Sequence, residues 1–160
     1  RVFTTAGDPK KTALCEELGA ARAINYREED FVAVVKQETG GKGVDVILDM
    51  VGGDYIQRNI DSLARDGRLV NIAYQKGAGA QVNFLSVMLK RLTITGSTLR
   101  VRPNAEKAII CDALKREVWP DFDKGRLRPV TDSTFPLVKT ADAHARMAKS
   151  AHAGKIVLTP

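Results

Sequence analysis

Short runs of apolar and β-branched residues alternate along the chain with segments in which apolar residues recur every three or four positions. The runs predict strands, which are residues 1–5, 22–26, 46–50, 67–74 and 91–98. The periodic segments predict helices, which are residues 9–19, 28–41, 56–63, 84–89 and 104–118. Strands that alternate with helices are typical of βα units, which build a parallel sheet through right-handed crossovers. The pattern therefore predicts an α/β fold with a doubly wound parallel sheet.

Individual residues support two of these predicted elements, the helix at residues 9–19 and the strand at residues 46–50. Asp8 is a good N-cap, and Pro9 suits the first helical position, where the N–H that proline lacks would be unpaired anyway. Gly19 suits the left-handed position that ends a helix. The nearly continuous apolar run VILDM at residues 46–50 indicates a strand that is buried on both faces.

The alternation changes near residues 120–128, where Pro, Asp and Gly cluster. Beyond this cluster the pattern predicts a short strand, an Ala-rich helix, a turn and a final strand. We therefore predict two domains, residues 1–125 and residues 126–160.

Composition limits the classes of function. The chain of 160 residues, 44% hydrophobic and 28% charged, is typical of a globular domain. It has no apolar window of about 18 residues, so no membrane association is expected. The net charge of +6 suits an anionic ligand or a solvated surface, but no basic run is interleaved with aromatic residues, so nucleic acid is not an expected partner. Cys15 and Cys111 lie on predicted helices and are expected to be buried thiols of a reducing compartment.

Several catalytic and binding motifs are absent. The chain contains neither the dinucleotide fingerprint G-x-G-x-x-G in a strand-to-helix setting nor the P-loop consensus. It also lacks the G-x-S-x-G motif of α/β hydrolases. His144 and His152 are far in sequence from both cysteines, which is not the spacing of a zinc site, so no metal is expected.

Six stretches nevertheless resemble one family along the whole chain: TAGDPKK, INYREEDF, GGKGVDVILDMVGGDY, LARDGRLVNIA, ITGSTLRVRP and HAGKIVLTP. The family is the zinc-independent medium-chain dehydrogenases/reductases of the NADPH:quinone oxidoreductase type, which includes zeta-crystallin. The resemblance covers the C-terminal portion of such a protein. It implies that residues 1–125 are a partial dinucleotide-binding Rossmann domain and that residues 126–160 are the C-terminal segment of a GroES-like catalytic domain.

The resemblance makes the strand at residues 1–5 the second strand of the Rossmann fold, with the glycine fingerprint expected upstream of this chain. In the strand order 3-2-1-4-5-6, the first strand lies at the centre of the sheet. We therefore expect a Rossmann-like sheet that lacks its first strand and has two unpaired edges in its interior, and we expect this chain to be a piece of a longer protein.

The cofactor implied by the resemblance is NADP(H). Gly7 would let the backbone approach the ribose, while Lys11 and Tyr26 would contact the 2′-phosphate and the adenine side. An NAD-selective site places a carboxylate at this strand end, whereas here lysines follow Gly7, and both a lysine and a helix N-terminus favour an anion. Asp8 leaves two alternatives open, because it is either only an N-cap or a carboxylate that repels the phosphate. Lys11 also has an alternative, as part of a solvated helix face.

The resemblance also implies that loops at the carboxyl ends of later strands surround the nicotinamide. The residues it assigns there are Val51, Gly52, Ile72, Ala73, Tyr74, Leu99 and Arg100. The alternative for Gly52 is a turn that leads into the next helix.

The activity implied for the longer protein is hydride transfer from NADPH to a quinone or a conjugated carbonyl. The alternatives are an NADPH-dependent enone or enoyl reductase of the same fold, and a non-catalytic crystallin-like module that binds nucleotide or RNA. No catalytic residue is assigned in this chain. A homodimer through the nucleotide domain, with the strand at residues 91–98 as its edge, and a cytoplasmic location are further expectations of the resemblance.

Overall fold

The computed structural model describes all residues from 1 to 160, and the chain forms two compact units, residues 1–101 and residues 102–160. The predicted boundary after residue 125 concerns the domains of a longer protein, and it stays a prediction.

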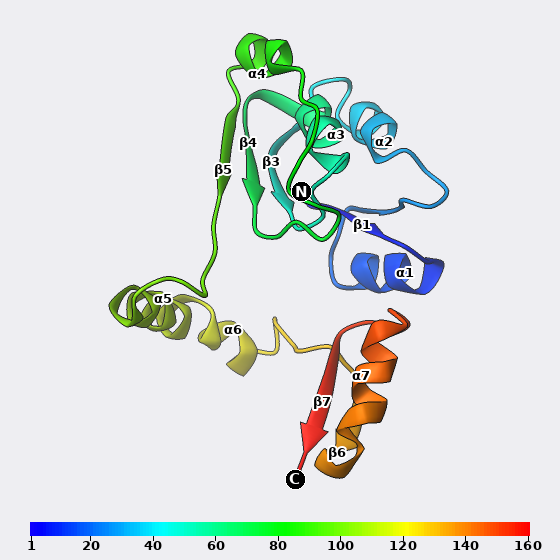
Figure 1. Cartoon of the computed structure of the whole chain (residues 1–160), viewed down its shortest axis with the longest axis vertical. Helices are drawn as coiled ribbons and strands as arrows, with labels where there is room; N and C mark the ends of the chain where they lie inside the picture. Colours follow the sequence, from blue (N-terminus) through cyan, green and yellow to red (C-terminus); the bar gives the residue numbers. More distant parts are fainter. The chain divides into compact units, whose positions relative to one another are not determined.

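Unit 1 alternates strands and helices, as the sequence pattern predicts (Figure 1). The elements in chain order are β1 (Phe3–Ala6), α1 (Pro9–Glu17), β2 (Arg22–Asn25), α2 (Phe31–Glu38), β3 (Val44–Asp49), α3 (Tyr55–Ser62), β4 (Leu63–Asn71), α4 (Phe84–Lys90) and β5 (Thr93–Gly96).

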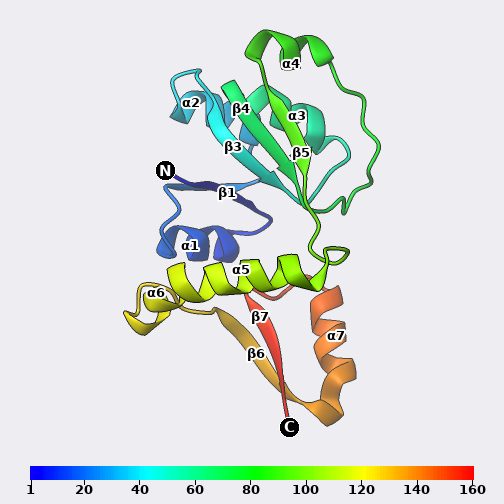
Figure 2. The same ribbon diagram turned by 90° about the vertical axis from the view of Figure 1, so that its left-hand side faces the viewer.

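The strands of unit 1 form two separate parallel sheets. One sheet pairs β1 with β2, and the other has the order β3-β4-β5, whose strands lie side by side in Figure 2. No pairing joins β1 to β3, so each of these strands has a free edge. This confirms the expected α/β fold with parallel strands and an interrupted sheet.

Side-chain caps account for the starts of the first two helices. The Asp8 carboxylate accepts a hydrogen bond of 3.0 Å from the backbone N–H of Lys11, which confirms the predicted N-cap of α1. Gly19 follows the helix with φ +103°. The predicted start of α2 at residue 28 is wrong, because the Asp30 carboxylate caps the helix at the N–H of Val32 and the helix begins at Phe31.

The predicted boundary between α3 and β4 is also wrong. Leu63 was expected on the helix, but it is the first residue of β4. Its side chain packs with Ile60 and Leu69 in one buried cluster. A buried position of this kind is compatible with a strand as well as with a helix. Burial of an apolar residue therefore does not distinguish the two assignments.

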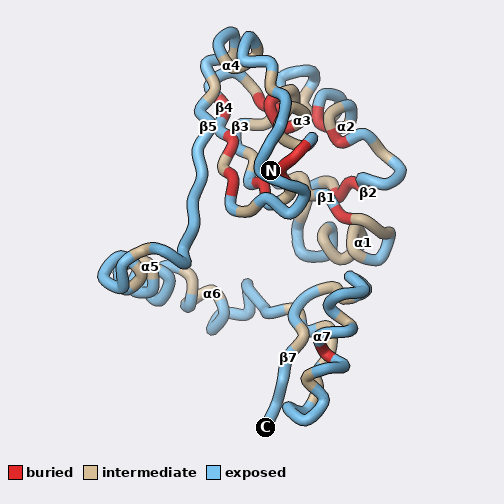
Figure 3. Tube along the Cα trace, in the orientation of Figure 1, coloured by how far each residue is buried: buried red, intermediate tan, exposed pale blue.

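Each sheet of unit 1 has its own small core. Ile24, Phe31 and Val35 form one buried cluster, and Ile60, Leu63 and Leu69 form the other. The buried segments of Figure 3 follow these elements of unit 1. Two local cores are what a sheet divided into two parts produces.

The third strand is not buried on both faces, contrary to the prediction. Ile47 packs against the cluster beneath α3 and α4, whereas Val46 and Leu48 are 59% and 65% exposed. Successive side chains of a strand point to opposite faces. Within unit 1 helices cover only one face of β3, and the apolar composition of the strand does not reveal this.

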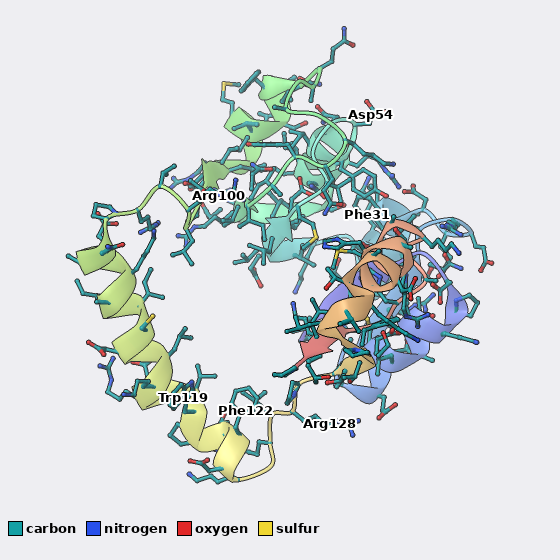
Figure 4. All side chains as sticks on the ribbon, turned by 60° about the horizontal axis from the view of Figure 1, so that its bottom comes forward. Phe31, Asp54, Arg100, Trp119, Phe122 and Arg128 are labelled. Carbon is teal, nitrogen blue, oxygen red and sulfur yellow. The ribbon has the colours of Figure 1, made fainter.

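Unit 2 consists of α5 (Asn104–Glu117), α6 (Trp119–Asp123), β6 (Thr131–Pro136), the 3₁₀ helix η1 (Leu137–Lys139), α7 (Thr140–Ala148) and β7 (Lys155–Thr159). Strands β6 and β7 pair in parallel, with the predicted strand–helix–strand order. The sequence analysis missed α6, on which Figure 4 labels Trp119 and Phe122, because the cluster of Pro, Asp and Gly there indicates a boundary. Pro120 lies in the first turn of this helix, where proline is tolerated.

An ion pair joins the elements of unit 2 that follow α6. The carboxylate of Asp132 accepts hydrogen bonds from Nε and Nη2 of Arg146 at 2.6 and 2.9 Å. It also accepts one from the backbone N–H of Ala153 at 3.0 Å. These hydrogen bonds favour the ionised carboxylate and hold the pKa of Asp132 well below its ordinary value. The bonds from the Arg146 guanidinium have the largest effect. The pair thus connects β6, α7 and the turn before β7.

Two composition-based expectations have different outcomes. Cys111 is exposed on α5, a helix with no buried residue, and Cys15 is partly buried, so the prediction of two buried thiols is wrong. None of the helices is both long enough and apolar enough to cross a membrane.

Candidate functional site

The carboxyl ends of β1 and β2 bring two of the predicted site residues together. Ala6 and Asn25 pair in register, and the backbone N–H of Tyr26 donates to the Ala6 carbonyl at 3.1 Å. Gly7 and Tyr26 are the next residues of the two strands. They are therefore neighbours because of the parallel pairing, although they are far apart in sequence.

Gly7 has no room for a side chain. A Cβ atom built there would lie 2.5 Å from the Tyr26 hydroxyl and 3.4 Å from Nε of Arg27. A larger residue would displace the Tyr26 ring, so the absence of a side chain at Gly7 lets Tyr26 lie against the backbone at this strand end.

Lys11 lies in the first turn of α1, beside Asp8. Its Nζ is 3.5 Å from Oδ2 of Asp8, while the backbone N–H of Lys11 binds the same carboxylate. This backbone hydrogen bond, opposed by partial burial, keeps the pKa of Asp8 below its ordinary value. Asp8 therefore caps α1 as a carboxylate and places a negative charge beside Lys11, while its effect on a bound phosphate stays a prediction.

Arg27 was not singled out from the sequence. Asn25 fixes the turn that carries it: the Asn25 side-chain oxygen accepts from the N–H of Arg27 at 3.2 Å, and its carbonyl accepts from Glu28 and Glu29 at 3.0 and 2.9 Å. From the sequence, Arg27 is one charge in a polar turn. Its position directly after Tyr26, at the end of a strand, was the available signal.

A second part of the candidate site follows β3. The Asp49 side chain is only 4% exposed, and it accepts hydrogen bonds from the N–H groups of Val51 and Gly52 at 2.8 and 3.1 Å. Gly52 has φ +68°, and a Cβ there would lie 2.7 Å from Cδ1 of Tyr74. The structure thus places Gly52 beside Tyr74, while Val51 and Gly52 are both bound to Asp49. Asp49, which organises this loop, was not predicted as a site residue.

The remaining predicted residues follow β4 and β5. The Ile72 N–H donates to the Asp49 carbonyl at 2.8 Å, and Ala73 is the next residue. Leu99 and Arg100 are exposed residues beyond the end of β5, and Figure 4 labels Arg100 there. Asn71, at the end of β4, donates to the Thr95 carbonyl at 3.3 Å, while its buried Oδ1 has no hydrogen-bond partner. That oxygen is thus a buried and unsatisfied polar atom at the carboxyl end of β4.

A cavity of unit 1 is separate from these loops. It has a volume of about 340 Å³ and lies where β4 begins, with Lys36, Arg65 and Lys90 among its lining residues. The Lys90 ammonium donates to the carbonyls of Ile60, Asp61 and Leu63 at 3.2, 3.1 and 2.8 Å, and burial lowers its pKa. Lys36 and Lys90 lie in the last turns of their helices, where cations offset the helix dipole. These contacts give the cavity a structural role.

Comparison with known proteins places this geometry in a family. Residues 18–158 match the family model of zinc-binding dehydrogenases. A quinone oxidoreductase of Lama guanicoe is 32% identical over 99% of this chain and 46% of its own length. A 2-haloacrylate reductase of a Burkholderia species is 30% identical over 99% of this chain and 48% of its own length. The chain therefore spans about half the length of the curated relatives it matches.

A solved structure shares the fold. The crystal structure of Escherichia coli quinone oxidoreductase in complex with NADPH is 30% identical, with a TM-score of 0.84 over all of this chain and 49% of that protein. The fold class predicted from the sequence is thereby confirmed.

The family description implies zinc, but these residues do not supply a site for it. The chain contains no group of three or more His, Cys, Asp or Glu side chains that could hold a metal ion. The donor set therefore does not fit a zinc centre.

Proposed function

This chain belongs to the zinc-binding dehydrogenase family, and we propose that it is the nucleotide-binding part of an oxidoreductase that uses a nicotinamide cofactor. The observation that carries the proposal is the juxtaposition of Gly7 and Tyr26 at the ends of two parallel strands. Ligands of doubly wound folds bind beyond the carboxyl ends of the strands. The helix that follows Gly7 presents its N-terminus and a lysine, which suits a phosphate.

We propose NADP(H) as the cofactor. Gly7 would contact the ribose, and Lys11 and Tyr26 would contact the 2′-phosphate and the adenine side. A carboxylate that selects NAD binds the ribose 2′-hydroxyl. Asp8 is instead engaged by the N-terminus of α1 and by Lys11, which supports the choice of NADP(H).

The nicotinamide end would lie at the loops after β3, β4 and β5. The residues proposed there are Val51, Gly52, Ile72, Ala73, Tyr74, Leu99 and Arg100. The hydrogen bonds from Val51 and Gly52 to Asp49 support this assignment, because they hold the first loop in one conformation. The unpaired Asn71 Oδ1 supports a polar ligand group near the same edge.

When bound, NADPH supplies the hydride that a quinone acceptor would receive. The residues of this chain would bind and orient the cofactor, and no catalytic residue is assigned among them. A conjugated carbonyl is the second candidate acceptor, and the similarity to a 2-haloacrylate reductase favours it. We also propose a cytoplasmic location, for which the two free cysteines are the support.

Titration of the full chain with NADPH and NADH tests the cofactor assignment. Lys11→Ala is expected to weaken NADPH binding about tenfold and to leave NADH binding unchanged, because a hydrogen bond to a charged group contributes about 1.5–3 kcal/mol. Lys10→Ala is the matched control, since Lys10 is an exposed lysine one residue away. Unchanged NADPH affinity in Lys11→Ala would refute the phosphate assignment.

A further inference from the structure

Arg27 is a cation at the candidate site whose charge no carboxylate neutralises. Two cations near it are paired, since Arg22 forms an ion pair with Glu29 and Lys11 forms one with Asp8. Arg27 contributes its backbone N–H to Asn25, but its guanidinium forms neither an ion pair nor a hydrogen bond. The Asp8–Lys11 pair has no net charge, whereas Arg27 carries an unneutralised positive charge beside Gly7.

The guanidinium lies beside Gly7. Nε of Arg27 is 3.4 Å, and the Tyr26 hydroxyl 2.5 Å, from the point that a Cβ of residue 7 would occupy. Two hydrogen-bond donors from the end of β2 therefore flank the backbone at the end of β1. The three hydrogen bonds to Asn25 hold the turn that presents both of them.

We propose that Arg27 binds the 2′-phosphate of the cofactor and selects NADP(H) over NAD(H), an inference that rests on the proposed function. A guanidinium binds phosphate through two parallel N–H donors, and this geometry is stronger and more directional than the point charge of a lysine. A phosphate monoester carries about −1.5 to −2 charge at neutral pH. Lys11 shares its charge with Asp8, so the discrimination between a 2′-phosphate and a 2′-hydroxyl falls chiefly on Arg27.

The test compares two ligands that differ only in the 2′-phosphate. Calorimetric titration of the full chain with adenosine 2′,5′-bisphosphate and with 5′-AMP gives an affinity ratio. Arg27→Gln is expected to lower this ratio at least tenfold while leaving 5′-AMP binding unchanged. Arg27→Lys keeps the positive charge but lacks the planar guanidinium. Its affinity ratio for the two ligands is therefore expected to lie between that of Arg27→Gln and that of the unmodified chain.

Arg65→Gln is the matched control. Arg65 is an exposed arginine of the same unit, 73% accessible and located near the start of β4, so its removal changes the net charge equally. Its ratio is expected to equal that of the unmodified chain. Circular dichroism of each variant checks the fold. If Arg27→Gln does not fold, the affinity ratio of Arg27→Lys for the two ligands tests the inference, and a ratio equal to that of the unmodified chain would overturn it.

The failures of the two proposals are distinguishable. If the unmodified chain prefers the bisphosphate and Arg27→Gln keeps that preference, the inference about Arg27 is wrong while the proposed function stands. Equal losses for both ligands in Arg27→Gln, or an equal fall of the ratio in Arg65→Gln, also overturn the inference. If the unmodified chain binds neither ligand, the proposed nucleotide-binding function fails and the inference fails with it. If the unmodified chain binds both ligands equally, the choice of NADP(H) and the inference fail, while nucleotide binding stands.

Discussion

At the scale of single residues, Asp8 caps a helix and lies beside the lysine that we propose to bind the cofactor. Its carboxylate caps α1 through the N–H of Lys11, and the same carboxylate lies 3.5 Å from the Lys11 ammonium. Capping needs an acceptor oxygen, which asparagine also supplies. An asparagine would therefore keep the cap and remove the negative charge beside the proposed phosphate position.

Asp8→Asn is accordingly expected to strengthen NADPH binding severalfold with little change in thermal stability. Titration with NADPH at low and high salt measures this effect, and the gain should shrink at high salt, because screening weakens the interaction between exposed charges. Asp8→Ala serves as the control, since it removes both the charge and the cap and should lower the melting temperature. Equal NADPH affinity in the Asn variant and the unmodified chain would show that the carboxylate does not face the phosphate.

At the scale of elements, one carboxylate of unit 2 connects three parts of that unit. Asp132 of β6 binds Arg146 of α7 through two hydrogen bonds and also accepts from the turn at Ala153. Both donors favour the ionised form, so the pKa of Asp132 in the folded chain lies below the value of about 3.9 for an unfolded aspartate. The contribution of this group to stability is therefore fully present above that value and is lost as the pH falls below it.

Asp132→Asn is expected to lower the melting temperature at pH 7. The difference from the unmodified chain should shrink as the pH falls from 5 to 2, because Asp132 is then protonated in the unfolded chain while it stays ionised in the folded chain, and this reduces its contribution to stability. Thermal unfolding followed by circular dichroism across this range gives the comparison. If the difference in melting temperature between the two proteins stays constant from pH 7 to pH 2, the charge of Asp132 does not contribute to stability.

At the scale of the whole molecule, the free strand edges are the main feature. The sheet order leaves β5 with one unpaired edge, and β1 and β3 each have one as well. All residues of β5 are exposed. Unpaired edges of exposed strands favour pairing with another chain. This supports the proposal of a homodimer through the nucleotide domain, with β5 at the contact.

Light scattering tests this proposal on the full chain, whose single-copy mass is 17.4 kDa. We expect a mass of two copies, and a mass of one copy for Ile94→Lys, because a charge on an edge strand opposes pairing. Leu85→Lys on α4 is the control, since Leu85 is also an exposed apolar residue. A monomeric unmodified chain, or a dimer that survives Ile94→Lys, contradicts the assignment to β5.

The sequence alone determined the features that depend on local chemistry. Hydrophobic periodicity predicted the alternation of strands and helices, and cap chemistry predicted the start of α1 at Pro9. Parallel pairing followed from the alternation, and in the structure this pairing places Gly7 beside Tyr26. These predictions succeed because backbone propensity and capping act over a few neighbouring residues.

Only the tertiary structure decided which faces are covered and which distant side chains meet. It exposed Leu48, which the sequence analysis expected to be buried, and moved Leu63 from a helix to a strand. It also brought Arg27 to Gly7 and tied Asp49 to the loop after β3. The physical reason is that burial and contact depend on which elements pack together, and that packing is not encoded in the periodicity of any single segment.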